Sequence, residues 1–136
     1  MTKSNPIELV PKNKFDTSTI STLMLLPESE LTQILPELIL WIADFNWPVA
    51  AELIPVLSKY PSSIIPVIKD TLKVQQDDNM LKYWVVSKLI PSLPTSYQLM
   101  LLDNVKRIFL NPSENEMYEE VAEQAGLLLQ TMEKFN

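Results

Sequence analysis

The sequence predicts an all-α protein, and two observations carry that prediction. Large aliphatic residues recur at three- and four-residue steps through most of the chain, the spacing that lines one face of an α-helix, whereas a strand would alternate. Gly126 is the only glycine in the sequence of 136 residues, although β-hairpins usually need glycine in their turns. A chain of this length can bury a core as one domain, so we expect a single helical-repeat domain over residues 1–136.

The first fifteen residues are predicted to form a basic N-terminal arm. Three lysines flank a short apolar island at residues 7–10, by which we expect the arm of residues 1–15 to dock on the rest of the molecule. Asp16 can cap a short helix over residues 17–26, which Pro27 closes.

The remaining chain is predicted to form about three antiparallel helix pairs joined by short polar corners. The expected helices cover residues 30–43 and 47–59, then 63–75 and 80–92, then 96–110 and 114–134, with corners at 44–46, 77–79 and 111–113. Each unit is near 35 to 40 residues, the size of a HEAT-like pair. We therefore expect a right-handed HEAT-like stack preceded by the short N-terminal helix.

The first corner is the most informative stretch, with the sequence W-I-A-D-F-N-W-P-V-A at residues 41–50. Asp44 and Asn46 are interpreted as helix caps, because their short side chains accept backbone N–H groups at a helix start. Pro48 would lie in the first turn of the next helix, where its missing N–H costs little. These three residues are the predicted structural turn.

Capping and proline positions set the other expected boundaries. Ser113 and Glu116 match a capping box, and the Asp-Asp-Asn run at 77–79 is interpreted as a cap because it lacks the glycine and glutamate of a calcium loop. Pro66 falls in the first turn if a serine at 62 or 63 is the cap, whereas Pro55 predicts a kink or an early helix end.

Composition excludes several classes of function. The chain has no histidine and no cysteine, so it has no serine or cysteine triad, no disulfide and none of the commonest zinc ligands. We expect no metal and no cofactor. The formal net charge of −6 and the pI near 4.6 disfavour nonspecific nucleic-acid binding and favour a basic partner. No apolar run is long enough for a membrane span or a signal peptide, so a cytoplasmic location is expected.

Four boxes of residues resemble an uncharacterised bacterial domain family. They are L-V-P-K-N-K-F-D at 9–16, D-F-N-W-P-V-A at 44–50, K-Y-W at 82–84 and P-S-E-N-E at 112–116. The family pattern has glutamine where this chain has Ala43, and threonine where it has Ser113. The resemblance implies a HEAT-like helical fold of unknown function, and some small bacterial proteins of this general kind are immunity proteins that neutralise a toxin.

The aromatic residues are the first candidate binding residues. Trp47, Tyr83 and Trp84 fall on second helices of successive predicted pairs, where they could line the inner face of the stack and anchor a partner. Lys82 would then be a polar edge of that face. Packing between repeats is the alternative, and Trp41 is expected to be plain core.

The acidic cluster of the last helix is the second candidate. Glu119 and Glu123 are four residues apart and would share one helix face, which offers a basic partner an acidic strip. A solvated helix face is the alternative.

The leading hypothesis is a non-enzymatic helical-repeat protein that binds a basic protein partner, as a monomer or a homodimer. A narrower form is an immunity-type inhibitor of a basic toxin. The alternative is a small-ligand binder or carboxylate-dependent enzyme with a pocket near Trp47, Asp78 and Tyr83, where Lys82 would also lie.

Overall fold

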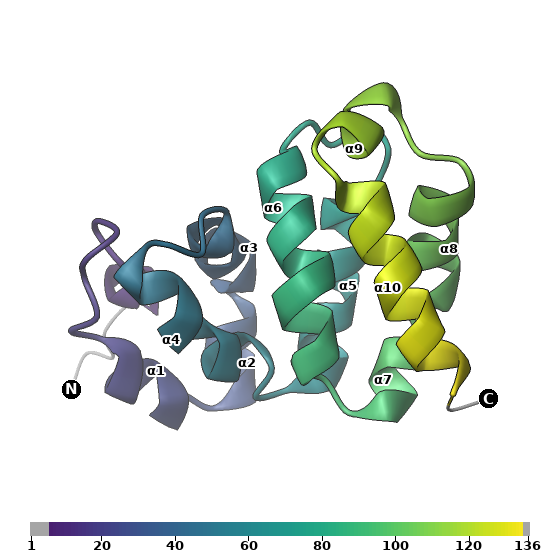
Figure 1. Cartoon of the computed structure of the whole chain (residues 1–136). Coiled ribbons are helices and arrows are strands. Elements are labelled where there is room, and N and C mark those ends of the chain that lie inside the picture. Colours follow the sequence, from purple (N-terminus) through teal and green to yellow (C-terminus); the bar gives the residue numbers. More distant parts are fainter. Residues whose placement is uncertain (1–5, 135–136) are drawn as a thin grey trace, which may run out of the picture.

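The computed structural model describes residues 6–134, and every regular element in that range is a helix (Figure 1). The all-α prediction is confirmed. The first half of the chain contains η1 (Pro6–Leu9), α1 (Ile20–Leu25), α2 (Glu28–Thr32), α3 (Leu35–Ile39), η2 (Leu40–Ile42) and α4 (Pro48–Leu57). The second half contains α5 (Pro61–Thr71), α6 (Asn79–Trp84), η3 (Val85–Leu89), η4 (Ile90–Ser92), α7 (Thr95–Leu99), α8 (Leu102–Leu110), α9 (Glu114–Tyr118) and α10 (Val121–Glu133).

One cluster of buried aliphatic side chains runs through both halves of the molecule. Figure 1 shows α1 to α4 on one side and α5 to α10 on the other. Elements of both halves place fully buried side chains in the same core, among them Leu38, Leu53, Ile68, Val85, Ile108 and Val121. This continuous burial is what the three- and four-residue spacing predicts.

The corners lie close to their predicted places, but the helices between them are more interrupted. Residues 44–46 and 111–113 are outside helices, as expected, whereas α5 ends at Thr71 and widens the second corner to residues 72–78. The predicted helix at 30–43 is split into α2, α3 and η2, and Pro36, which has no N–H to continue the helical ladder, accounts for the break between α2 and α3. The HEAT-like stack and its hand stay predictions.

Two more predicted helices are divided where no proline stands. The segment 96–110 forms α7 and α8, and the segment 114–134 forms α9 and α10. The second break is at Glu120, whose φ of 65° puts it in the left-handed region. That backbone conformation cannot continue a right-handed helix.

The first corner keeps its position but not its predicted capping. The Asp44 carboxylate accepts the N–H of Asn46 at 2.9 Å, which closes a turn within the corner. Trp47 is the N-cap residue of α4, without a side-chain hydrogen bond, so the prediction that Asp44 and Asn46 cap this helix is wrong. The N-terminal arm replaces the cap, because the carbonyl of Lys14 accepts the N–H of Val49 at 3.2 Å.

Of the predictions made from prolines, some are confirmed and one is wrong. Pro48 begins α4, as predicted, and α4 ends at Leu57, which agrees with an early end after Pro55. Pro66 lies in the interior of α5, which already begins at Pro61, so its predicted place in the first turn is wrong. Both interior prolines are exposed, so the carbonyls that lose a helical partner can bond to water.

The arm docks largely as predicted within the residues that the structure describes. Leu9 and Val10 pack against the core, and the Thr19 hydroxyl donates to the Leu9 carbonyl at 2.6 Å. Asp16 does not cap α1, whose N-cap residue is Thr19. It accepts hydrogen bonds from the backbone N–H and the hydroxyl of Ser18 and holds the turn before the helix.

Gly126 allows α10 to approach α8 closely. A Cβ at position 126 would lie 2.7 Å from Cε1 of Phe109, closer than carbon atoms normally approach. Alanine is about 1 kcal/mol better than glycine in a helix interior, so the ring contact opposes the gain in propensity.

We expect Gly126→Ala to leave the free energy of unfolding unchanged or lower it. In a Phe109→Ala background the same substitution should raise that free energy by up to about 1 kcal/mol, because the ring is gone. Urea unfolding of the four proteins in this double-mutant cycle measures the difference. Equal effects in both backgrounds would contradict the close approach.

Candidate functional site

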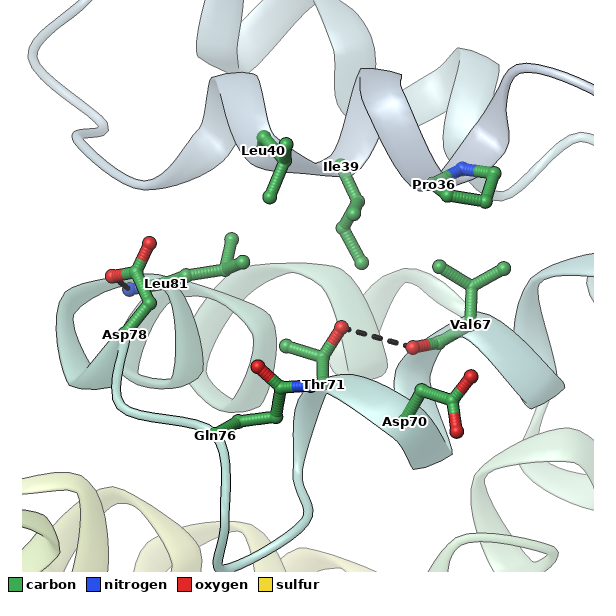
Figure 2. Close-up of a pocket in the computed structure, with 9 residues that line it drawn as sticks. All are labelled: Pro36, Ile39, Leu40, Val67, Asp70, Thr71, Gln76, Asp78 and Leu81. Carbon is green, nitrogen blue, oxygen red and sulfur yellow. Dashed lines mark hydrogen bonds between the residues drawn. The ribbon is translucent and has the colours of Figure 1, made fainter.

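Of the residues that the alternative hypothesis places at one pocket, Asp78 lies at a hollow of its own. Asp78 lines a hollow of about 180 Å³ between the α3–η2 segment and the α5 and α6 helices, where Ile39 and Leu40 face Leu81 (Figure 2). Its carboxylate accepts the Leu81 N–H at 3.0 Å, which confirms it as the cap of α6. Neither Trp47 nor Tyr83 lines this hollow.

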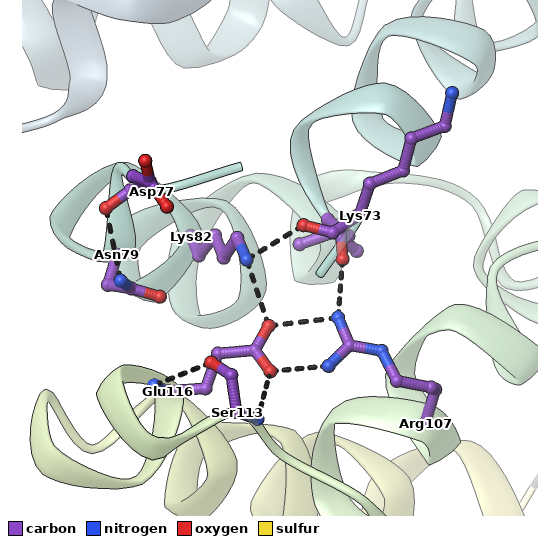
Figure 3. A network of polar contacts seen from close by, with 8 residues as sticks. Lys73, Asp77, Asn79, Lys82, Arg107, Ser113 and Glu116 are labelled. Atoms are coloured by element: carbon purple, nitrogen blue, oxygen red, sulfur yellow. Dashed lines mark hydrogen bonds and ion pairs between the residues drawn. The ribbon is translucent and has the colours of Figure 1, made fainter. Parts of the chain in front are cut away.

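Lys82 is part of a buried ionic network and not of an exposed face (Figure 3). Its side chain is fully buried, and Nζ donates to Oε2 of Glu116 at 2.9 Å and to the carbonyl oxygen of Lys73 at 2.9 Å. A lysine charge is buried only where partners replace its hydration. The prediction that Lys82 edges a binding surface is therefore corrected: it ties α6 to α9.

Glu116 is the centre of this network. The Arg107 guanidinium faces the carboxylate and donates to both of its oxygens, while its Nη2 also donates to the Leu72 carbonyl at 2.6 Å. The Ser113 N–H donates to Oε1 of Glu116 at 2.8 Å, and Glu116 N–H donates to the Ser113 hydroxyl at 3.2 Å. The predicted capping box is thereby confirmed, and its glutamate joins α6, α8 and α9.

The network also sets the ionisation of Glu116. Burial raises the pKa of this carboxyl, but hydrogen bonds from Arg107, the Ser113 N–H and Lys82 outweigh it and lower the pKa from 4.5 to about 2. The carboxylate therefore stays charged wherever the protein is handled near neutral pH.

A second pocket, which we call the α6–α9 pocket, opens beside this network. It has a volume of about 330 Å³, and its lining residues are Met80, Tyr83, Trp84, Tyr118, Glu119 and Glu120. Tyr118 is 83% exposed and Met80 is 47% exposed, whereas Tyr83, Trp84 and Glu119 are half-buried. Large apolar side chains at a concave surface are a common feature of binding sites.

Contacts between aromatic rings hold Tyr83 and Trp84, the aromatic wall of this pocket, in place. The rings of Tyr83 and Trp84 are in edge contact with centroids 4.8 Å apart, and Trp84 stacks on Phe45 of the first corner at 5.2 Å. Trp47 packs instead against Trp41, with ring centroids 5.9 Å apart. Tyr83 and Trp84 thus line one pocket together, whereas Trp47 does not line it.

The two acidic candidates are separated by the interruption of the helix at Glu120. Because α9 ends at Tyr118 and α10 begins at Val121, Glu119 and Glu123 do not share one continuous helix, and the predicted strip is wrong. Glu119 lines the α6–α9 pocket, whereas Glu123 is exposed on α10 and does not line it.

The structure adds Met80, Tyr118 and Glu120 to the candidate site. Helical spacing could have paired Met80 with Tyr83 and Trp84, since they are three and four residues apart on one helix. The positions of Tyr118 and Glu120 depend on a turn with a left-handed residue. No glycine or asparagine at this turn predicts that conformation from the sequence.

In the part of the chain that the structure describes, no three acidic side chains gather as a metal site. No helix there is long and apolar enough to cross a bilayer.

The chain belongs to the family described as "Domain of unknown function (DUF5071)", whose pattern matches residues 9–129. This match confirms the predicted resemblance to an uncharacterised domain family. No curated protein matches the chain.

We expect Glu116→Gln to lower the free energy of unfolding by about 3 kcal/mol or more at pH 7, because the Lys82 ammonium would stay buried without a counter-charge. The control is Glu114→Gln, an exposed glutamate on the same helix with the same charge change. Chemical unfolding of the three proteins measures this, and equal midpoints would contradict a stabilising role of the network.

The cost of Glu116→Gln should depend on pH. A carboxyl whose pKa is lowered from 4.5 to about 2 contributes stability that is complete above pH 4.5 and is lost as the pH falls toward 2. The difference in unfolding free energy between wild type and Glu116→Gln should therefore shrink through this window. A difference that stays constant from pH 6 to pH 2.5 would exclude this linkage.

Glu120→Gly should raise the free energy of unfolding by up to about 1 kcal/mol, because glycine relieves the left-handed strain. Glu119→Gly is the matched control and should be destabilising, since φ is −88° at Glu119. Thermal unfolding of both variants decides the point, and destabilisation of both would contradict a strained Glu120.

Proposed function

We propose that this DUF5071 protein is a non-enzymatic protein-binding module that holds a basic segment of its partner in the α6–α9 pocket. The observation that carries the proposal is the pairing of uncompensated acids with exposed aromatic surface at one concavity. Glu119 and Glu120 take part in no ion pair among residues 6–134, and Tyr118 is 83% exposed beside them.

Charge favours such a partner at both long and short range. The chain has a net charge of −6, which attracts a basic protein before contact. At contact, partly desolvated carboxylates beside aromatic rings strengthen their attraction for a cation, because water screens them less there.

The pocket is also supported by a fixed base. The buried Lys82–Glu116 pair joins α6 to α9, the two elements that supply its walls. A surface that does not have to be ordered on binding loses less entropy when the partner docks.

A narrower form of the proposal is an immunity-type inhibitor that covers a basic toxin in the cytoplasm. A toxin gene directly upstream, whose product loses its toxicity when the two proteins are co-expressed, would support it. A solitary gene would count against it.

The test is affinity capture from the native cell, with partners identified by mass spectrometry. We expect wild type and Glu52→Gln, which removes an exposed charge on α4, to retain the same basic protein. The variant with both Tyr118→Ala and Glu119→Gln should bind it roughly tenfold more weakly or worse, and added salt should weaken binding to the wild type.

Retention that is equal in all three proteins would show that the partner docks elsewhere. An acidic partner, or a catalytic turnover that Glu119→Gln abolishes, would contradict the proposal. Glu123→Gln measures the width of the surface: binding should be unchanged, because Glu123 lies outside the α6–α9 pocket.

A further inference from the structure

We infer that the α6–α9 pocket receives one arginine side chain of the partner, stacked on its aromatic wall and paired with its carboxylates. This inference rests on the proposed function and names the chemistry of the anchor. It follows from three features of the pocket: its aromatic residues, its two glutamates and the absence of a cation among its lining residues.

The walls fit a flat cation. Tyr83 and Trp84, whose rings are in edge contact at an interplanar angle of 81°, line the pocket together with Tyr118. A cation placed against such ring faces is attracted by their quadrupoles, at no cost in ordering, since Trp84 is already held by stacking on Phe45.

Glu119 and Glu120 line the same pocket because the helix is interrupted between α9 and α10. Consecutive residues of a continuous helix point about 100° apart. The left-handed Glu120 ends that geometry, and both Glu119 and Glu120 line the same pocket. Strained residues of this kind are often found at binding sites, and this one leaves two glutamates at the same pocket.

The pocket has no cation of its own. Its six lining residues include no lysine or arginine, and Lys82, the lysine next to Tyr83 in sequence, is turned away and bound to Glu116. Lys88 lies over the ring of Phe45, with Nζ 5.7 Å from its centroid, and does not line the pocket. The negative charge at the rim is therefore left for a ligand.

Arginine suits this arrangement better than lysine. Its guanidinium is planar, stacks on aromatic rings and pairs with carboxylates through two parallel hydrogen bonds. It is also more weakly hydrated than an ammonium group, so it loses less on entering a pocket that is partly apolar. A lysine would gain the charge attraction but neither the stacking nor the bidentate pairing.

The probe is a blocked pentapeptide, glycine-leucine-arginine-leucine-glycine, with analogues carrying lysine, citrulline or norleucine at the centre. Titration into the isotope-labelled protein, followed by NMR, should shift the signals of Tyr118 to Glu120 and the indole N–H of Trp84. We expect the arginine peptide to bind about threefold or more tighter than the lysine peptide, and about tenfold or more tighter than the citrulline and norleucine peptides.

Protein variants assign the site. A variant with both Glu119→Gln and Glu120→Gln should bind the arginine peptide about tenfold more weakly, whereas Glu52→Gln should bind it as wild type does. Tyr118→Leu should reduce the preference for arginine over lysine, since it removes a ring and keeps the apolar bulk. Unchanged unfolding midpoints verify that the variants are folded.

The outcomes separate the anchor from the wider proposal. Equal binding of the arginine and lysine peptides, or no saturable shift at this pocket up to roughly 10 mM peptide, would overturn the arginine anchor. Capture of a basic partner that still depends on Tyr118 and Glu119 would then leave the proposed function standing. Capture that ignores those residues would overturn both.

Discussion

The buried carboxylate of Glu116 is the interaction on which the rest of the second half depends. It accepts hydrogen bonds from Lys82 and Arg107 and from the backbone at Ser113, so one side chain joins α6, α8 and the start of α9. The side chains of Lys82 and Glu116 are fully buried charges. They are tolerated only because each replaces the water that the other has lost. The network therefore specifies where α9 lies, and with it the mouth of the α6–α9 pocket.

The same network explains why three consecutive residues of α6 have different roles. Lys82 points into the interior, while Tyr83 and Trp84 reach the surface on another side of the helix. A π-helix, η3, follows directly at Val85, and such wide turns often accompany functional side chains. The ionic side of α6 holds α9 in place, and the aromatic side forms the wall that α9 then completes.

The strained residue Glu120 lies close in the chain to Glu116, which anchors α9. Glu120 adopts a left-handed conformation that glutamate does not favour, just after the helix that Glu116 anchors. In return, the chain turns before α10 and leaves Tyr118, Glu119 and Glu120 around one hollow. In the proposed function, this surface recognises a cation through its aromatic rings and through acids that make no ion pair among residues 6–134.

The sequence by itself determined the class of fold, the corners at 44–46 and 111–113, and the capping box of Ser113 and Glu116. Each of these depends on residues close together in the chain, where periodicity and hydrogen-bonding capacity act locally. Large rings and acids that no helix cap needs can be recognised in any sequence, and Tyr83, Trp84 and Glu119, which the sequence marks in this way, line one pocket.

Only the tertiary structure decided which candidates meet. Lys82 is buried because Glu116 and Arg107, 34 and 25 residues further along the chain, arrive beside it, and no local pattern reports such a meeting. The arm supplies the hydrogen bond that Asp44 and Asn46 were expected to give to α4, through the carbonyl of Lys14. Glu123 is separated from Glu119 because Glu120 takes a left-handed conformation, which interrupts the helix.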